Sequence, residues 1–226
     1  MSAALRIVRM TETDYETAWR WQVDTAVSVR AGAPDTLALL QHPPVYTFGR
    51  RVRAEHLLLS EERLAARGAA VVETNRGGDI TFHGPGQVVG YAILNLRRLG
   101  LGPVDYVCRL EEALIGVLAR AGITGYRVRG RPGVWTDGGK IAAIGVRLEG
   151  GVTLHGFALN VHTDLSYFDA IVPCGLEGTS VTSMSRLLSA PPRLVDVEHA
   201  IVEEFARVLG YEVETSVARQ KIGGLP

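Results

Sequence analysis

The sequence predicts an α+β fold, and three observations lead to that class. Helical segments and strand-like segments are grouped along the chain and do not alternate as regular β-α-β units. Many of the strand-like segments are joined by tight glycine turns, which indicates antiparallel hairpins packed with helices. Hydrophobic residues make up 46% of the 226 residues, and the mean hydropathy of +0.12 is that of a chain able to bury a sizeable core.

The first half of the chain is expected to begin with an amphipathic helix. Residues 13–16 read T-D-Y-E, a capping box, and helical spacing of apolar residues continues up to Gly32. Residues 36–40 are typical of a strand, and a turn and a second short strand follow in Q-H-P-P-V-Y-T-F-G-R. Ser60 is expected to cap a short helix that stops at Gly68, before strands over 70–74 and 88–96 with a glycine-rich loop between them.

In the second half, Asp105 is expected to open a helix that ends at Gly122. Four short strands, over 126–129, 133–136, 140–148 and 152–161, are expected to form hairpins, and Asp196 to cap a last helix closed by Gly210. The segment from about 220 to 226 is expected to be a loose tail. Because no proline-rich linker interrupts the chain, we expect one catalytic domain over 1–226.

Charge and cysteine content exclude several classes of function. The 24 basic residues balance the 24 acidic ones, so no whole-molecule signature for nucleic acid or an anionic membrane is present. No apolar run approaches the roughly 18 residues of a membrane span, and the first ten residues have no export signal. The two cysteines form neither a zinc pattern nor a disulfide framework. We therefore expect a cytoplasmic enzyme without metal or other cofactor.

Lysine is rare in this chain, and that rarity directs attention to Lys140. Lys140 and Lys221 are the two lysines among the 24 basic residues. A lysine at the edge of a strand usually extends to water. A desolvated lysine can also act as a general base or acid, whereas arginine keeps its proton in proteins. The scarcity of lysine favours the second interpretation for Lys140.

Of the two cysteines, Cys174 is the candidate nucleophile. It lies between Pro173 and Gly175 at the end of an apolar run, in a predicted turn, whereas Cys108 falls in the middle of a predicted helix. Buried helix thiols usually behave as small hydrophobic groups, so Cys108 is expected to be structural. An ammonium group close to a thiol favours the thiolate, so Lys140 and Cys174 on adjacent turns would form a reactive dyad.

Residues 76–87, R-G-G-D-I-T-F-H-G-P-G-Q, are either a long irregular hairpin turn or a loop that a ligand approaches closely. Its glycine spacing does not match a dinucleotide fingerprint, and G-G-K-I is not a phosphate-binding P-loop. His155 and His162 are seven residues apart, which disfavours a metal pair on one continuous strand. Each is expected to be a hydrogen-bonded structural histidine or part of a pocket wall.

Together these segments resemble the lipoyl(octanoyl) transferases, which move an octanoyl group from acyl carrier protein to a protein lysine. The resemblance covers nearly the whole chain, from L-Q-H-P-P-V-Y-T-F-G-R through the 76–87 segment, G-V-W-T-D-G-G-K-I-A-A-I-G and H-G-F-A-L-N-V-H-T-D-L to I-V-P-C-G-L-E-G-T-S-V-T-S. Asp79 and Asp137 stand at positions that look variable in the family. The resemblance implies the fold of the biotin and lipoate protein ligase catalytic domain, a thioester on Cys174, and Lys140 as the residue that lowers the thiol pKa and shuttles protons.

The resemblance also implies an acyl pocket and two protein partners. The partners are acyl carrier protein as octanoyl donor and the lipoyl domains of 2-oxoacid dehydrogenase and glycine cleavage proteins as acceptors. The implied pocket residues are Arg76, Gly77, Gly78, Asp79, Ile80, Thr81, Phe82, His83, Ala143, Ile144, Gly145, Gly156, Phe157 and Ala158.

Three alternatives stay open at this level. The chain could be an ATP-dependent lipoate or biotin ligase on the same fold, although no adenylate-phosphate loop is recognisable. It could also be an acyl-binding module that does not need Cys174. The arginines at 50, 51 and 53, or those at 127, 129 and 131 along one predicted strand face, would either dock an acidic carrier protein or form solvated edges.

Overall fold

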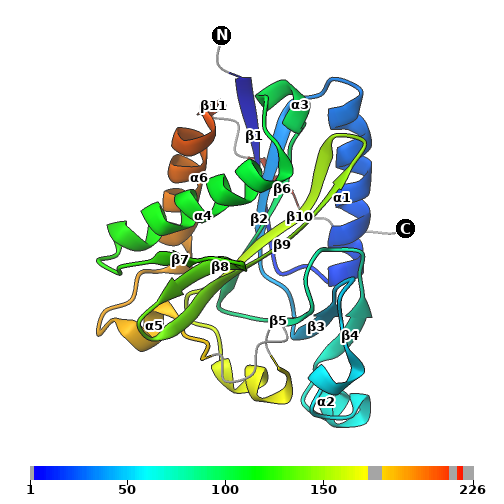
Figure 1. Ribbon diagram of the computed structural model, residues 1–226, viewed down its shortest axis with the longest axis vertical. Coiled ribbons are helices and arrows are strands. Elements are labelled where there is room, and N and C mark those ends of the chain that lie inside the picture. The colour runs from blue at the N-terminus through cyan, green and yellow to red at the C-terminus, as the bar shows by residue number, and fades with distance from the viewer. Residues whose placement is uncertain (1–2, 173–179, 214–217, 221–226) are drawn as a thin grey trace.

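The computed structural model describes residues 3–172, 180–213 and 218–220. Within them, nine strands form one mixed sheet (Figure 1). Its order is β11 (Tyr211–Val213), β1 (Ala3–Met10), β2 (Asp35–Leu40), β6 (Gln87–Ile93), β10 (Val152–Asn160), β9 (Gly139–Glu149), β8 (Arg131–Thr136) and β7 (Tyr126–Val128), and β12 (Ala218–Gln220) also pairs with β1. The pairs that involve β1 are parallel and the others antiparallel.

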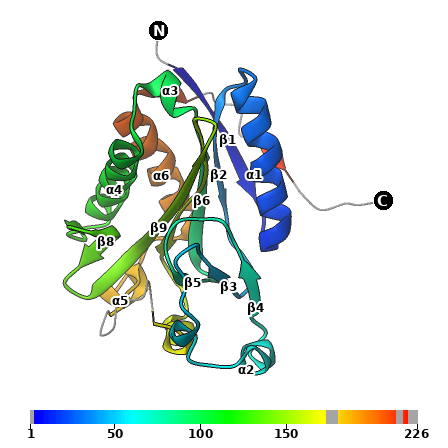
Figure 2. The same cartoon turned by 45° about the vertical axis from the view of Figure 1, so that its right-hand side comes forward.

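A second, smaller sheet lies at one end of the molecule (Figures 1 and 2). Its strand order is β4 (Ala70–Glu73), β3 (Val45–Phe48) and β5 (Ile80–His83). Helix α2 (Glu61–Ala66) and the 3-10 helices η1 (Ala54–His56) and η2 (Leu165–Ala170) accompany it. Tyr46, Phe82 and Phe168 share an aromatic core there, so this end has a hydrophobic cluster of its own.

Helices cover both faces of the large sheet. Helix α1 (Tyr15–Arg30) lies on one face, and α4 (Pro103–Arg120) and α6 (Leu194–Leu209) lie on the other (Figure 2). The buried stripe of α4, which includes Leu110, Leu114 and Val117, joins the central core. Short helices α3 (Leu96–Leu99) and α5 (Met184–Leu187) complete the described helices. In these ranges no helix has both the length and the apolar character that a membrane crossing demands.

The α+β class is confirmed, and the structure adds one unit that the sequence analysis missed. Strand β1, helix α1 and strand β2 form a parallel β-α-β unit at one side of the sheet. Leu5, Ile7 and Val8 of β1 are fully buried, because successive side chains point to opposite faces of the sheet and both faces are covered by hydrophobic clusters. The glycine-rich loop also contains a strand, β5, because its four residues Ile80–His83 pair with β3 and are all buried.

Several predicted element ends were wrong by a few residues. Asp14, and not Thr13, caps α1, because its Oδ1 accepts the N–H of Thr17 at 2.8 Å. Helix α4 starts at Pro103, where a proline is tolerated in the first turn, and Asp105 lies inside it. Asp196 is in the first turn of α6 and not at its cap. Gln220, assigned to the tail, belongs to β12, and residues 221–226 lie outside the described part.

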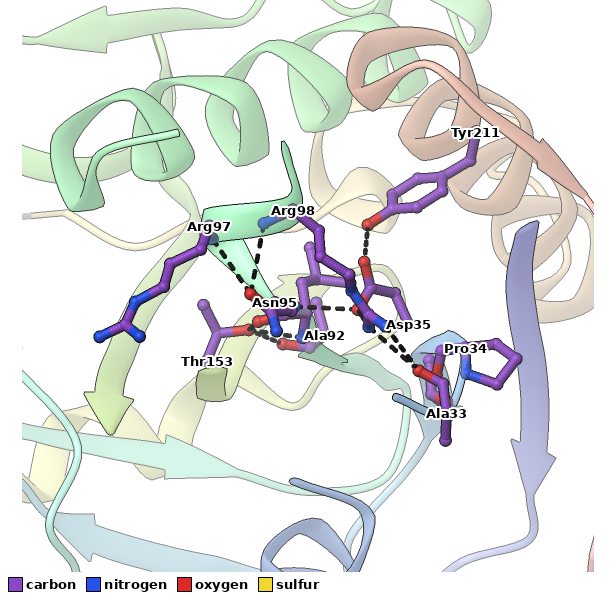
Figure 3. A network of polar contacts seen from close by, with 11 residues as sticks. Ala33, Pro34, Asp35, Ala92, Asn95, Arg97, Arg98, Thr153 and Tyr211 are labelled. Carbon is purple, nitrogen blue, oxygen red and sulfur yellow. Dashed lines mark hydrogen bonds and ion pairs between the residues drawn. The ribbon is translucent and has the colours of Figure 1, made fainter. Parts of the chain in front are cut away.

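A buried carboxylate ties the start of β2 to two other parts of the fold (Figure 3). Asp35 is 3% exposed and accepts hydrogen bonds from the Tyr211 hydroxyl at 2.6 Å, the Asn95 N–H at 2.9 Å and Arg98 Nη2 at 2.5 Å. Burial, followed by the bond to Asp35, raises the pKa of Tyr211 far above its ordinary value, so the phenol stays a donor. This network joins the edge of the sheet to α3.

Candidate active site

Lys140 is buried near the start of β9. Its side chain is 6% exposed, and its Nζ lies 5.4 Å from the centroid of the Trp135 ring, a cation–π distance. Gly133 on the paired strand β8 makes room for it. With φ of +124°, a Cβ at Gly133 would lie 2.7 Å from Lys140 Cε and 2.4 Å from the Ala142 oxygen. The predicted alternative, a lysine that extends to water, does not describe this side chain.

The segment that contains Cys174 is attached at both ends to the region around Lys140. Cys174 itself lies outside the described residues. Before it, the N–H of Val172 donates to the carbonyl of His56 at 2.8 Å. After it, the carbonyl of Ser180 accepts the N–H of Lys140 at 2.8 Å, and Thr182 N–H donates to the Lys140 carbonyl at 3.0 Å. The described chain therefore stops at Val172, beside His56, and resumes at Ser180, beside Lys140.

A cavity of about 50 Å³ lies between β5, β9 and β10. Strands β9 and β10 form one wall, with Ile144 opposite Phe157 in their antiparallel register. The structure brings together here most of the residues predicted for an acyl pocket. They are Arg76, Gly78, Asp79, Ile80, Thr81, His83, Ala143, Ile144, Gly145, Gly156, Phe157 and Ala158.

Two predicted pocket residues are placed elsewhere. Gly77 lines the larger opening beside this cavity and donates its N–H to the Val146 carbonyl at 3.0 Å. Phe82 points into the core of the small sheet, where its ring stacks on Tyr167 at 4.5 Å between centroids. The reason is the strand alternation of β5, which places Thr81 and Phe82 on opposite faces.

Glycine is required where β10 approaches β6. A Cβ at Gly156 would lie 2.0 Å from the Gly90 oxygen, and one at Gly90 would lie 2.1 Å from the Phe157 ring. A side chain at Gly156 would require a backbone shift, and a side chain at Gly90 would displace the Phe157 ring. Gly90 therefore leaves room for the Phe157 ring, which lines the cavity.

Arg76 is held rigidly at the cavity wall. It is 7% exposed, and its guanidinium donates to the Thr47 hydroxyl at 3.1 Å, to the Thr47 carbonyl at 2.6 Å and to the Gly77 carbonyl at 3.0 Å. Its planar fork therefore joins β3 to the glycine loop. The positive charge also lowers the pKa of nearby His155, after the larger effect of burial.

The far end of the cavity is lined by polar rings. Tyr15 and Tyr91 lie there with His83 and His155. Tyr15 OH is 3.3 Å from His155 Nδ1, and the Tyr91 hydroxyl is 2.7 Å from Nε2 of His42 just behind the wall. His155 has φ of +61°, a strained conformation for a residue with a side chain. The sequence analysis identified His155 as a possible pocket wall, but it missed Tyr15, His42 and Tyr91 as site residues.

Burial keeps these three histidines neutral. It lowers the pKa of His42 to about 4 and that of His155 to about 3. The pKa of fully buried His83 lies well below its ordinary value, because of burial and then the neighbouring His42. Burial raises the pKa of Tyr15 to about 12. At neutral pH these rings are therefore polar but uncharged, and Arg76 supplies the positive charge of the cavity wall beside them. His162, by contrast, is exposed and hydrogen-bonds the Pro192 carbonyl.

A chain of hydrogen bonds runs from this polar end to the strand partner of Lys140. His83 Nδ1 is 2.8 Å from Gln87 Oε1, and Gln87 Nε2 donates to Asn160 Oδ1 at 2.9 Å. Asn160 Nδ2 donates to the Thr182 carbonyl at 3.0 Å. Because Thr182 pairs with Lys140 through the backbone, the pocket and the lysine share one rigid framework.

A second cavity of about 540 Å³ opens beside the first, and Lys140 lines it. Arg51 and Arg53 from one predicted arginine group and Arg131 from the other also line it. The prediction that residues 127, 129 and 131 share one strand face is wrong. Arg127 is on β7, where it pairs with Glu111, and Arg131 is on β8 beyond the turn that holds Arg129. Tertiary structure brings parts of both arginine groups to one opening.

The prediction for Cys108 is also wrong in one respect. Cys108 is exposed on α4 and is not a buried core thiol. It occupies the solvent side of the helix, while Leu110 and Leu114 occupy the buried side. The described ranges contain no group of three or more histidine, cysteine, aspartate or glutamate side chains that could hold a metal ion.

Comparison with solved structures places this fold among the lipoate and biotin ligases. A lipoate protein ligase from T. acidophilum with bound lipoic acid superposes with a TM-score of 0.77 at 15% identity, over 98% of this chain and 92% of that one. A biotin protein ligase from Aquifex aeolicus superposes with a TM-score of 0.54 at 10% identity, over 92% of this chain and 70% of that one. At these identities the similarity is one of fold.

Sequence comparison is more specific. Residues 14–206 match the model of the lipoyl protein ligase A/B catalytic domain. The octanoyltransferase of Mycobacterium leprae is 49% identical over 206 residues, which are 88% of this chain and 86% of that protein. The octanoyltransferase of Geobacter metallireducens is 47% identical over 197 residues, 87% of this chain and 89% of that protein. The chain therefore belongs to the lipoyl protein ligase A/B catalytic-domain family, and within it to the octanoyltransferases.

Proposed function

We propose that this protein transfers an octanoyl group from acyl carrier protein to a lysine of a lipoyl domain, through a thioester on Cys174, in the cytoplasm. One observation carries the proposal beyond the family assignment. The segment that contains Cys174 is attached at His56 and at Lys140, and both residues line the opening next to the acyl cavity. A nucleophile, a lysine and an apolar pocket are then available to one thioester substrate.

In the first half-reaction, the Cys174 thiolate attacks the carbonyl carbon of the carrier thioester. The new carbon–sulfur bond forms as the bond to the carrier sulfur breaks, and the Lys140 ammonium gives its proton to that sulfur, so the carrier leaves as a thiol and Lys140 becomes neutral. The ammonium of Lys140 stabilises the thiolate, whose ordinary thiol pKa is about 8.5. Backbone N–H groups of the glycine-rich segment are the candidates for stabilising the negative oxygen that develops.

In the second half-reaction, the lysine of the lipoyl domain attacks the acyl-enzyme and Lys140 accepts a proton. The octanoyl chain stays in the cavity lined by Ile144, Phe157 and Ala158. Each buried methylene is worth about 0.8 kcal/mol, so pocket length selects chain length. A chain that is too long would meet the hydrogen-bonded Tyr15 and His155 at the far end.

The larger opening suits an acidic protein that carries a flexible prosthetic arm. Arg51, Arg53 and Arg131 surround it, so it offers positive charge next to Lys140 although the whole chain has no net charge. Acyl carrier protein is our proposed donor and the lipoyl domains of 2-oxoacid dehydrogenase and glycine cleavage proteins our proposed acceptors. A lipoate protein ligase from Thermoplasma acidophilum with a similar fold has been studied together with its E2 lipoyl domain.

The test is to incubate the protein with octanoyl-acyl carrier protein alone and weigh the intact chain. We expect an octanoyl adduct without nucleotide or metal, and its transfer when a lipoyl domain is added. Cys174→Ser should remove both, and Cys108→Ala is the matched control because Cys108 is exposed on α4. An adduct on Cys108, or full transfer by the Cys174→Ser protein, would contradict the proposal.

A second candidate is an ATP-dependent ligase that activates free octanoate or lipoate. The fold is compatible with this second candidate, because a lipoate-protein ligase A bound with ATP superposes with a TM-score of 0.77 at 16% identity. Adding free octanoate and ATP to the protein and a lipoyl domain separates the two candidates. Modification that depends absolutely on ATP would assign the protein to the ligases.

A further inference from the structure

His56 and Asp79 form a hydrogen-bonded pair at the mouth of the larger cavity. Nδ1 of His56 lies 2.5 Å from Oδ2 of Asp79, and the other carboxylate oxygen accepts the N–H of Ile80 at 2.7 Å. The side chains are 14% and 11% exposed. Both residues line the cavity that Lys140 also lines. The pair joins η1 to the residue that precedes β5.

This arrangement specifies which nitrogen of the imidazole carries the proton. A carboxylate that accepts from Nδ1–H holds the neutral ring in the tautomer whose Nε2 has a free lone pair. Among the described residues, none is recorded as a hydrogen-bond partner of that Nε2. His56 is thus oriented as a base whose second nitrogen is open to a group that enters the cavity.

The pair is also linked to the last described residue before the Cys174 segment. The carbonyl of His56 holds the N–H of Val172, two residues before Cys174 in the sequence. The charged groups around the cavity are Asp79 on one side and Arg51, Arg53, Arg131 and Lys140 on the others.

The proton balance of the second half-reaction calls for such a group. The incoming lysine is an ammonium ion at neutral pH, with an ordinary pKa of about 10.4. As the carbon–nitrogen bond forms and the carbon–sulfur bond to Cys174 breaks, this nitrogen loses two protons. One returns to the cysteine sulfur through Lys140. The other has to leave to solvent, and a single lysine cannot accept both at once.

We propose that His56, positioned by Asp79, is a second general base of this half-reaction. It accepts a proton from the incoming ammonium at Nε2 and releases it to water at the cavity mouth. Lys140 handles the proton exchanged with the sulfur. The inference rests on the proposed function, because it assigns one step of that transfer to the His56–Asp79 pair.

The experiment isolates the second half-reaction. Octanoyl-enzyme is prepared first, mixed with a lipoyl domain in a single turnover, and followed by mass spectrometry from pH 5.5 to 9. For the wild-type chain we expect the transfer rate to rise with pH, because a general base acts in its deprotonated form. His56→Gln should slow transfer by about 100-fold at neutral pH, with formation of octanoyl-enzyme little changed.

Three further variants exclude a merely structural role. Asp79→Asn should slow transfer with formation of octanoyl-enzyme little changed, because the carboxylate that accepts the His56 Nδ1–H and orients the ring is lost. Imidazole in the buffer should restore transfer to His56→Gly. His199→Gln is the matched control, since His199 is exposed on α6, and its profile should match the wild type.

Each outcome has a distinct meaning. An unchanged pH profile in His56→Gln would overturn the inference and leave the proposed function intact. Equal losses of both half-reactions in His56→Gln, with no imidazole rescue of His56→Gly, would also overturn it, since they indicate a structural defect. Failure of the wild-type chain to form octanoyl-enzyme at all would instead overturn the proposed function.

Discussion

Acid should destabilise this protein strongly, because its buried histidines are neutral in the native state. The pKa of His42 is lowered to about 4 and that of His155 to about 3, in both cases chiefly by burial. The unfolded chain has the ordinary histidine pKa of about 6.5. Below that pH the unfolded state binds protons that the folded state does not, so stability falls as the pH falls and levels off only below the native pKa values.

The magnitude follows from these pKa values. At pH 5, each of the two histidines should lower the free energy of unfolding by about 2 kcal/mol relative to pH 8, or about 4 kcal/mol for the pair. Native domains have only about 5 to 15 kcal/mol in total. His83 contributes in the same direction, since its pKa is also lowered by burial.

The assay is urea unfolding at pH 8 and at pH 5, followed by tryptophan fluorescence. Carboxylates also titrate in acid, so the decisive quantity is the difference between wild type and His42→Gln. This variant should be less stable at pH 8, because His42 bonds Thr13 and Tyr91, but it should lose about 2 kcal/mol less on acidification. His199→Gln, an exposed replacement on α6, should keep the wild-type loss. Equal losses in His42→Gln and wild type would refute the reasoning.

Four other substitutions test the site and the fold. Lys140→Arg should form octanoyl-enzyme slowly, because Gly133 and Trp135 confine the side chain. The octanoyl-enzyme should then accumulate in single-turnover mass spectrometry, since arginine cannot accept a proton from the incoming lysine. Turnover at the wild-type rate would show that Lys140 acts by charge alone. Asp35→Ala should lower the free energy of unfolding in urea by about 3 to 5 kcal/mol, because it removes the shared acceptor of a buried network. Glu55→Ala, which breaks an exposed pair, should cost less than about 1 kcal/mol, and a similar cost at Asp35 would contradict the network's importance. Ala158→Leu enlarges a cavity-lining side chain and should shift kcat/KM from octanoyl toward shorter donors; unchanged selectivity would remove Ala158 from the acyl wall.

The sequence predicted most elements of this fold, because their signals are local. Helical spacing of apolar residues located α1, α4 and α6, and glycine turns located the hairpins of β8, β9 and β10. Strand β1 was missed because its partners are far away in the chain, at β2 and at the C-terminal strands. The helix starts were displaced because several polar residues in one turn can each act as a cap, and only backbone geometry selects among them.

The sequence alone also indicated the chemistry: a scarce lysine, a cysteine in a turn, and three segments that the family resemblance implies as an acyl pocket. It could not show that both arginine groups reach one opening, that Phe82 turns away from the pocket, or that Cys108 is exposed. Nor could it join His56 to Asp79, which are 23 residues apart and lie on separate elements. Spacing along a chain determines which side chains share a face of one helix or strand. Which faces meet is decided by the packing of the two sheets and their helices, and only the tertiary structure contains that information.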